Sequence, residues 1–485
     1  ISSTYQTADG IRMVYAQQTF EGLPLHNQML VLAFRNGQLL SSSGVILPQV
    51  DQRIEGSARE ATVSAFEAVK TAILDVKIQM PALMPPFTDD KGRQNFGRPG
   101  KYFTDITAHL IWVPVNDKQV RLAWEIELAP EQSSDHWMIR VDANTNQVIN
   151  KNNYTVYEHF GNPHGSNCQD GHKHNDHAQT KLNAGADRLV QPEGPLAVNS
   201  ATYRVIPYPA ESPIHPGGTA ALVTDPWNLA SGNATSLQWH YDGSVYHDST
   251  RGNNVWAIED RDASNATFGK AGLSTTAQPN LTLDYAPNYS QAPTTTTNQQ
   301  FAITNLFYWN NLVHDIAYLY GFDEPSGNFQ NNNQGRGGAG GDYVIADAQD
   351  AAGTNNANFS TPSDGVRPRM QMFLWTGVTP NIDGDLDNGI IAHEYGHGIS
   401  NRLTGGPSNV SCLGNAEQAG EGWSDYIALM TTTNWATAQV TDGSIPRGIG
   451  TYALNQPTSG AGIRRYRYTR SEEHTSELQS RQYLV

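Results

Sequence analysis

The most informative segment of the chain is Ile390-Ile-Ala-His393-Glu394-Tyr-Gly-His397. Its His-Glu-x-x-His pattern places two histidines four residues apart, and residues i and i+4 lie on one face of an α-helix. Both imidazoles can therefore reach one Zn²⁺ ion at about 2.0–2.1 Å. Glu394 follows the first histidine directly, where it can act as the general base that takes a proton from zinc-activated water.

The residues on either side of this pattern predict where the helix begins and ends. Asp387 and Asn388 are typical of a helix start, and Gly405-Gly-Pro407 is typical of an abrupt stop. We therefore predict a helix over Asn388–Leu403.

A catalytic zinc ion binds three protein ligands, so the two histidines need a partner. Glu421 and Asp425 lie four residues apart in Gly420-Glu-Gly-Trp-Ser-Asp425 and share a helix face. Glu421 would be the third ligand, and Asp425 would accept the free ring N–H of a ligand histidine. Glu417, with Glu421 as its own supporting carboxylate, fits the spacing as well, so spacing alone leaves both registers open.

The N-terminal part of the chain predicts a small α+β domain. Asp9-Gly10, Glu21-Gly22 and Asn36-Gly37 separate alternating apolar segments, which is a hairpin signal. Alanines recur on one face of Glu60–Ile73, which predicts an amphipathic helix. The predicted strands are Met13–Phe20, Gln28–Phe34, Leu39–Leu47, Gln119–Leu128, His136–Val141 and Gln147–Ile149.

The remaining chain divides into three segments. Residues 158–197 are polar and rich in histidine, which we interpret as an exposed linker that contains the processing region rather than a metal site. Residues 198–469 form the largest unit, rich in Asn and Gly, with helices predicted at Phe301–Tyr320, Asn388–Leu403 and Glu417–Thr432. Residues 470–485 resemble the conceptual translation of a sequencing-library adapter, and we exclude them from fold reasoning.

Composition excludes some classes of function. The 31 Lys and Arg residues against 47 Asp and Glu residues give a net charge of −16, which disfavours binding to nucleic acid or to an anionic membrane. No apolar run is long enough to span a bilayer. Cys168 and Cys412 are the two cysteines and define no disulfide framework.

Together these motifs resemble the fungalysin family of zinc metalloendopeptidases, which are relatives of thermolysin. The resemblance rests on His393–Pro407 and Glu421–Asp425, and Asn305–Asn311 and Gly327–Gln330 support it. Residues 1–157 resemble the fungalysin/thermolysin propeptide, with Phe20-Glu-Gly-Leu-Pro-Leu25 in its strand-turn pattern.

The resemblance implies a fold and a site. The expected fold is a small α+β prodomain followed by a thermolysin-like catalytic domain, with a strand-rich N-terminal part and active-site helices. His393, His397 and Glu421 would bind zinc and Glu394 would be the base, which settles the register in favour of Glu421 over Glu417.

The resemblance also implies how the protein works. It is expected to be a secreted, extracellular and monomeric zymogen whose propeptide acts as an intramolecular inhibitor and chaperone. The substrates would be proteins or peptides, cleaved at internal bonds and aligned along Asn355, Asn356 and Ala357 by β-augmentation.

One departure bears on activity. The family has a histidine downstream of the third ligand that stabilises the oxyanion, but this chain has none after Glu421 until His474, inside the segment that resembles an adapter. We therefore expect a zymogen that lacks most of its C-terminal helical subdomain and has weak or no activity, since losing one oxyanion donor costs about 10²–10³ in rate. The alternative function is a catalytically inactive, prodomain-docked binding or inhibitor protein that keeps the zinc site.

A calcium ion has little support in the sequence. Asp383-Gly-Asp-Leu-Asp387 begins like a calcium loop, but position 12 of such a loop is Glu394, the proposed base. We interpret the segment as a turn and helix N-terminus, where carboxylates complement the helix dipole.

Overall fold

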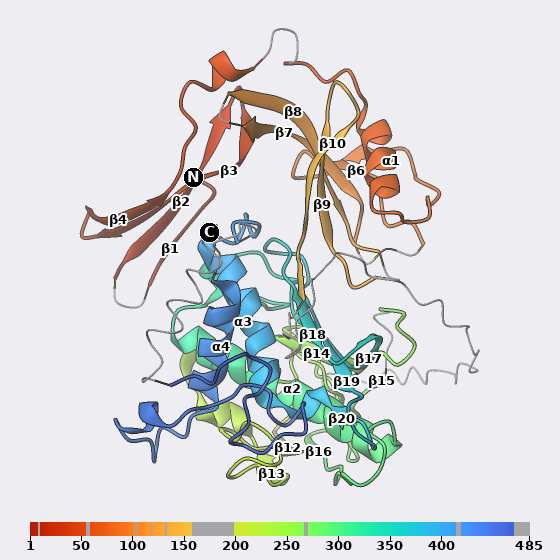
Figure 1. The fold of residues 1–485 in the computed structure, drawn as a ribbon, viewed down its shortest axis with the longest axis vertical. Coiled ribbons are helices and arrows are strands. Elements are labelled where there is room, and N and C mark those ends of the chain that lie inside the picture. Colours follow the sequence, from red (N-terminus) through yellow and green to blue (C-terminus); the bar gives the residue numbers. More distant parts are fainter. Residues whose placement is uncertain are drawn as a thin grey trace.

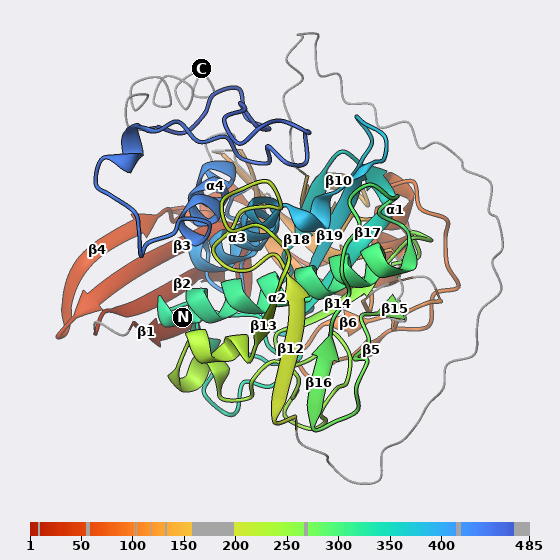
Figure 2. The same cartoon turned by 90° about the horizontal axis from the view of Figure 1, so that it is seen from below.

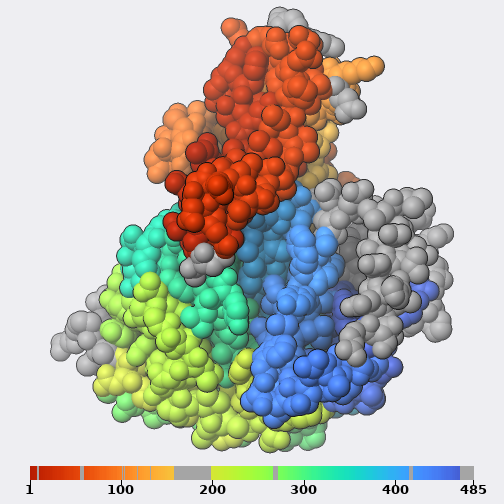
Figure 3. All heavy atoms as spheres, turned by 90° about the vertical axis from the view of Figure 1, so that its left-hand side faces the viewer, coloured from red at the N-terminus to blue at the C-terminus, as the bar shows by residue number. Residues whose placement is uncertain are grey.

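The computed structural model describes residues 1–7, 10–54, 59–100, 102, 104–116, 118–130, 133–157, 198–265, 270–413 and 419–469. The predicted linker 158–197 and the segment 470–485 lie outside these residues, as do Glu417, Cys168 and His474. No helix among the described residues is long and apolar enough to cross a membrane. The chain forms two units, the first rising as a lobe from the second (Figures 1 and 3).

In its described residues, the first unit is a ten-stranded sheet with one α-helix. The strand order is β1-β2-β3-β7-β8-β9-β10, with β4 paired to β3 and with β5 joined through β6 to β7. The elements are β1 Ser3–Gln6, β2 Arg12–Phe20, β3 Leu23–Arg35, β4 Gln38–Gly44, α1 Ala65–Asp75, β5 Phe87–Thr88, β6 Gln94–Asn95, β7 Thr107–Asn116, β8 Gln119–Leu128, β9 Trp137–Asp142 and β10 Val148–Asn153.

Local sequence signals account for much of this unit. Asn36 and Gly37 both have positive φ and join β3 to β4, so the predicted hairpin is confirmed. The predicted helix is confirmed but begins five residues later, at Ala65, because the backbone N–H groups of Thr62 and Val63 bond to the carbonyl of Ala143. The long strand β7 is not among the predicted strands.

The second unit combines two sheets with three helices. One sheet has the order β11-β18-β19-β17-β14-β15 with β20 beside β19, and the other has the order β13-β12-β16. The elements are β11 Thr155–Tyr157, β12 Ser200–Val205, β13 Ala221–Thr224, β14 Val255–Glu259, β15 Lys270–Ala271, β16 Asn280–Leu283, α2 Thr296–Leu319, β17 Val344–Thr354, β18 Ala357–Ser360, β19 Arg369–Trp375, β20 Ile382–Asp383, α3 Asn388–Thr404 and α4 Gly420–Thr431. Since β14, β17 and β19 are parallel, this unit is mixed α/β.

Helix α2 is the centre of the second unit. Every residue from Phe301 to Asp315 is buried, and the helix packs against β12, β14, β17 and α3 (Figure 2). It begins five residues before the predicted start at Phe301. His314 lies within it at 1% exposure, and its Nδ1 is 2.9 Å from Asp315 Oδ1.

The two units meet at a shared strand pair. Strand β11, at the end of the first unit, pairs antiparallel with β18 of the second, with Thr155 opposite Ser360 and Tyr157 opposite Asn358. Elsewhere the Tyr15 hydroxyl donates to the carbonyl of Leu403 at 2.8 Å. Strands from far apart in the sequence therefore join the two units.

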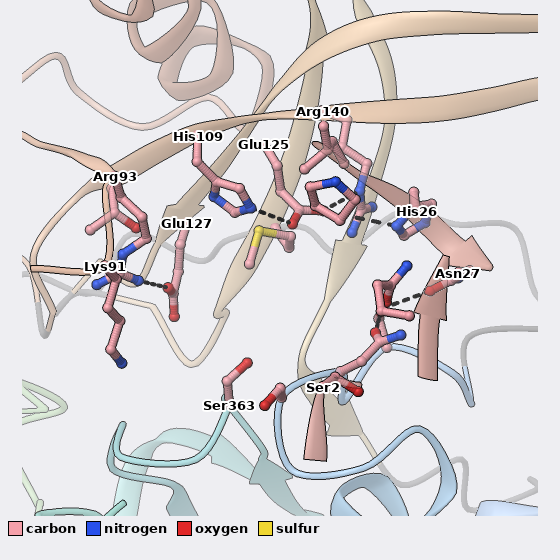
Figure 4. Close-up of a pocket in the computed structure, with 18 of the residues that line it drawn as sticks. Ser2, His26, Asn27, Lys91, Arg93, His109, Glu125, Glu127, Arg140 and Ser363 are labelled. Atoms are coloured by element: carbon pink, nitrogen blue, oxygen red, sulfur yellow. Dashed lines mark hydrogen bonds and ion pairs between the residues drawn. The ribbon is translucent and has the colours of Figure 1, made fainter. Parts of the chain in front are cut away.

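A cavity of about 260 Å³ lies between the units and is lined by charged groups (Figure 4). His26, Glu125 and Arg140 come from the first unit, and Ser363 and Asp364 come from the second. His26 Nδ1 lies 3.9 Å from Glu125 Oε2, and Arg140 Nε lies 2.7 Å from the same oxygen. Burial, helped by Arg140, lowers the pKa of His26 to about 4.

Because His26 lines this cavity, we predict that the first unit is less stable to unfolding at acidic pH. In the unfolded chain His26 becomes protonated below about pH 6.5, whereas in the folded chain it becomes protonated only below about pH 4. Between these two pH values the unfolded state binds more protons, so the free energy of unfolding falls as the pH is lowered. A histidine with this shift in pKa lowers the free energy of unfolding by about 2 kcal/mol between pH 6.5 and pH 5. Burial would raise the pKa of Glu125, but Arg140 and neighbouring histidines lower it, so its contribution is lost only at still lower pH.

Urea unfolding followed by tryptophan fluorescence at pH 7 and pH 5 measures this effect. The His26→Asn variant is expected to lose less stability over that range than the wild type, and the same loss in both proteins would contradict the role of His26.

Candidate metal centre

The two motif histidines lie on one face of α3. The helix runs over Asn388–Thr404, with Asp387 before its first residue and Gly405 after its last, so the predicted helix is confirmed to within one residue. His393 and His397 are 1% and 2% exposed. Their Nε2 atoms lie 3.0 Å apart, with the rings at 81° to one another.

A carboxylate from the next helix completes the group. Glu421, in the first turn of α4, places Oε2 3.3 Å from His393 Nε2 and Oε1 3.7 Å from His397 Nε2. Ligand atoms that each lie about 2.0–2.1 Å from one tetrahedral zinc ion are about 3.3 Å apart. Two imidazole nitrogens and one carboxylate at these separations therefore fit a zinc ion with a fourth position left open.

A glycine allows the two helices to approach this closely. A Cβ atom on Gly396 of α3 would lie 2.9 Å from the backbone Cα of Ser424 on α4. Glu421 lies one helical turn before Ser424, so the glycine sets the distance from the third donor to the histidines.

Asp425 supports the first histidine. Its Oδ1 lies 2.7 Å from His393 Nδ1, and the residue is buried. Burial alone raises the pKa of Asp425, but bonds from His393 and Arg464 outweigh that effect and lower the pKa to about 2. An ionised Asp425 in this position would hold the proton of His393 on Nδ1, which would leave Nε2 with a lone pair for a metal.

Two residues at this site were not predicted. Arg464 Nε donates to Asp425 Oδ2 at 2.7 Å, and its Nη2 donates to Glu421 Oε2 at 3.1 Å. The hydroxyl of Tyr468 also donates to Asp425 Oδ2. Both residues occur in Gly462–Tyr468, whose composition carries no metal-binding signal, so only the three-dimensional structure reveals their position.

The structure describes Glu394, the proposed base, but not Glu417, the alternative third ligand. Glu394 lies on α3 between the two histidines and is 0% exposed. Among the described residues, Glu421 is the acid grouped with His393 and His397 as potential metal ligands. Glu417 lies outside the described residues, so the choice between the two registers stays a prediction.

The predicted substrate-binding residues lie where β18 begins. Asn355 precedes the strand and its Oδ1 accepts from the backbone N–H of Thr376 at 2.7 Å, while Asn356 Oδ1 accepts from the N–H of Ala357 at 2.9 Å. The first bond joins the loop before β18 to the residue after β19, and the second joins that loop to the first residue of β18. On its outer side β18 is paired with β11, so in this chain it is not an open edge. Asn358 on β18 is 0% exposed.

The Asp383–Asp387 segment, which begins like a calcium loop, is a turn that leads into α3. The side chain of Asp383 accepts from the N–H of Asp385, and Asp385 Oδ2 accepts from the N–H of Gln349. All three aspartates of Asp383–Asp387 are buried. Asp387 directly precedes α3, but its side chain makes no capping bond to that helix, and its Oδ2 accepts from the backbone N–H of Ala453.

Comparisons with known proteins agree with this geometry. A model of the fungalysin metallopeptidase (M36) family matches residues 202–482, and a fungalysin/thermolysin propeptide motif matches residues 1–45. The first match runs into the segment 470–482, which the structure does not describe.

Curated relatives are similar along most of the chain. Extracellular metalloproteinase 2 of Trichophyton rubrum is 32% identical over 479 residues, which cover 97% of this chain and 66% of the relative. Extracellular metalloproteinase 4 of Arthroderma benhamiae is 31% identical over 478 residues, covering 97% and 64%. The chain thus spans somewhat less than two thirds of the length of these relatives. Among solved structures, the Bacillus megaterium YpeB C-terminal domain matches at 10% identity with a TM-score of 0.18, covering 31% of this chain and 55% of that one, too slight a similarity to bear on the fold.

The family match covers more than half of the chain and includes the two histidines, Glu394 and Glu421. The chain belongs to the fungalysin family of metallopeptidases.

Proposed function

We propose that this chain is the precursor form of a secreted zinc endopeptidase that hydrolyses internal peptide bonds of proteins. The observation that carries the proposal is the convergence of two imidazole nitrogens and one carboxylate on a single point, with separations of 3.0–3.7 Å. His393, His397 and Glu421 are the residues that would hold the ion. The relatives are named extracellular metalloproteinases, which supports secretion of this chain.

Zinc at this position would supply Lewis-acid chemistry, making a water molecule more acidic and polarising a carbonyl group. The protein supplies the proton transfers. Glu394 takes a proton from the attacking water on its carboxylate and returns it to the leaving amine. Glu394 is 0% exposed, so its electrostatic interactions with nearby charges are screened less than they would be at the surface.

The neighbouring side chains keep the ligands in place. Asp425 orients the ring of His393, and Arg464 bonds to both Asp425 and Glu421. We infer that Arg464 and Asp425 are positioning residues, which fix the third donor relative to the first.

Substrate alignment follows from the pairing of β18. An extended peptide that adds to a strand bonds through its backbone and so is accepted with many sequences. We infer that Asn356 and Ala357 align substrate in this way. In the uncleaved chain β11 already pairs with β18, antiparallel and through three residues. The prodomain therefore holds part of the strand that substrate would use, which supports a zymogen with boundaries at residues 1–157, 158–197 and 198–469.

Metal removal tests this function. Casein hydrolysis by the zinc-loaded full chain, which we expect to be weak, should stop after treatment with 1,10-phenanthroline and return when zinc is restored, because the donor set fits zinc. Mapping the new N-termini shows whether internal bonds are cut. Zinc binding without any peptide cleavage would instead support the inactive binding protein.

A further inference from the structure

We propose that Asp260, Asp347 and Asp350 bind a divalent cation, Ca²⁺, at a structural site separate from the histidine pair. One ligand oxygen from each residue lies within 4.8 Å of the other two. The three side chains are buried, with Asp347 and Asp350 at 0% exposure and Asp260 at 3%. Three buried carboxylates at this separation need a compensating charge.

The sheet is shaped to bring the three residues together. Asp260 directly follows β14, which runs parallel to β17, where the other two aspartates lie. In a regular strand Asp347 and Asp350 would point to opposite faces, because side chains alternate. The pairing of β17 with β19 shifts register between them, and Gln349 adopts a φ of 50°. This bulge turns Asp350 to the same side as Asp347.

The charge balance calls for a divalent ion. Arg369 Nη1 bonds to Asp347 and supplies one positive charge. Three carboxylates beside one guanidinium leave an excess of two negative charges, which one Ca²⁺ ion cancels. In the absence of an ion, burial and mutual repulsion raise the pKa of Asp260 to about 8 and that of Asp350 to about 7, so protons would compete for the site near neutral pH.

An independent observation comes from a neutral side chain on the neighbouring strand. Gln371, on β19 opposite Asp347, is 0% exposed and its Nε2 donates to Asp350 Oδ2 and to Asn265 Oδ1. Within the described part of the chain its Oε1 has no hydrogen-bond partner, and neither has Asp347 Oδ1. A cation beside Asp350 would be a partner for Asp347 Oδ1. It would also be a partner for Gln371 Oε1 if the amide turned by half a turn and exchanged its two donor bonds for that contact.

The donor set selects calcium over zinc. All the donors are carboxylate or amide oxygens, which hard cations prefer, whereas zinc prefers nitrogen and sulfur. Ca²⁺ accepts six to eight oxygen ligands in flexible geometry, whereas Mg²⁺ requires a near-ideal octahedron and keeps several of its waters. The site lies just before the loop that carries Asn355, so the ion would fix the strand proposed to align substrate.

Calorimetry of the full chain, with zinc kept saturating and Ca²⁺ varied, tests the proposal. Ca²⁺ at about a hundredfold excess over its Kd is expected to raise Tm by about 5–10 °C. Asp350→Asn is expected to abolish this rise while leaving Tm without Ca²⁺ unchanged or higher, because it removes repulsion. Asp342→Asn, a buried carboxylate paired with Arg402 outside the cluster, is the matched control and should keep the rise.

A second variant covers the case in which Asp350→Asn does not fold. Gln371→Leu leaves all charges in place and removes one oxygen, so the Ca²⁺ concentration for half of the Tm rise should increase. If millimolar Ca²⁺ does not change the Tm of the wild type, the proposal is wrong. So does a rise that survives in Asp350→Asn but is lost in Asp385→Asn, which would place the ion at the Asp383–Asp387 turn.

Discussion

Glu394→Gln is expected to abolish proteolysis while the zinc stays bound. The amide has nearly the same shape as the carboxylate and leaves His393, His397 and Glu421 untouched, but it cannot accept a proton from water. General-base catalysis contributes about 10²–10⁴ in rate, so kcat should fall by at least that range. The measurements are casein turnover and zinc per chain on the same preparation.

The matched control is Glu67→Gln, which makes the same change on α1 in the first unit, where Glu67 pairs with Lys70 near the surface. This variant should keep both turnover and zinc. Full activity in Glu394→Gln would exclude Glu394 as the base, and loss of zinc together with activity would instead give it a role in binding the metal.

Gly396→Ala is expected to reduce zinc binding without touching a ligand. The new Cβ would meet the backbone of Ser424 at 2.9 Å, so α4 must move away from α3. Overpacking of this kind costs about 1–3 kcal/mol, and the shift carries Glu421 away from the two histidines. Zinc affinity and turnover should fall together, and both are measured by titration with a competing chelator and by casein hydrolysis.

Gly422→Ala provides the comparison. This glycine lies next to Glu421 on α4, but nothing lies within 4 Å of an added Cβ. Alanine favours a helix over glycine by roughly 1 kcal/mol, so stability should be unchanged or higher and zinc binding normal. Equal zinc affinity in the two variants would show that the close helix contact does not set the position of Glu421.

Local signals made part of this structure predictable from sequence. The helix over Asn388–Thr404 follows from its start and stop residues, and the β3–β4 hairpin follows from Asn36-Gly37. The pairing of His393 with His397 depends only on helical periodicity, which is why four residues of spacing were enough to predict it. The family resemblance was confirmed by the family match.

Features that depend on distant partners were not predictable. Strand β11 pairs with β18 across two hundred residues, and the composition of Thr155–Tyr157 does not reveal this. Arg464 reaches Asp425 from a loop 39 residues further along the chain. The cluster of Asp260, Asp347 and Asp350 depends on a β-bulge in β17. In a regular strand the side chains of Asp347 and Asp350 would lie on opposite faces of the sheet, and the bulge places them on the same face.

Zinc content measured by atomic absorption on Glu421→Gln and Glu417→Gln distinguishes the two candidate third ligands. We predict about one zinc ion per chain in the wild type, about one in Glu417→Gln, and its loss in Glu421→Gln, since among the described residues Glu421 is the acid that lies beside His393 and His397. A Glu421→Gln protein that keeps its zinc, while Glu417→Gln loses it, would contradict the account.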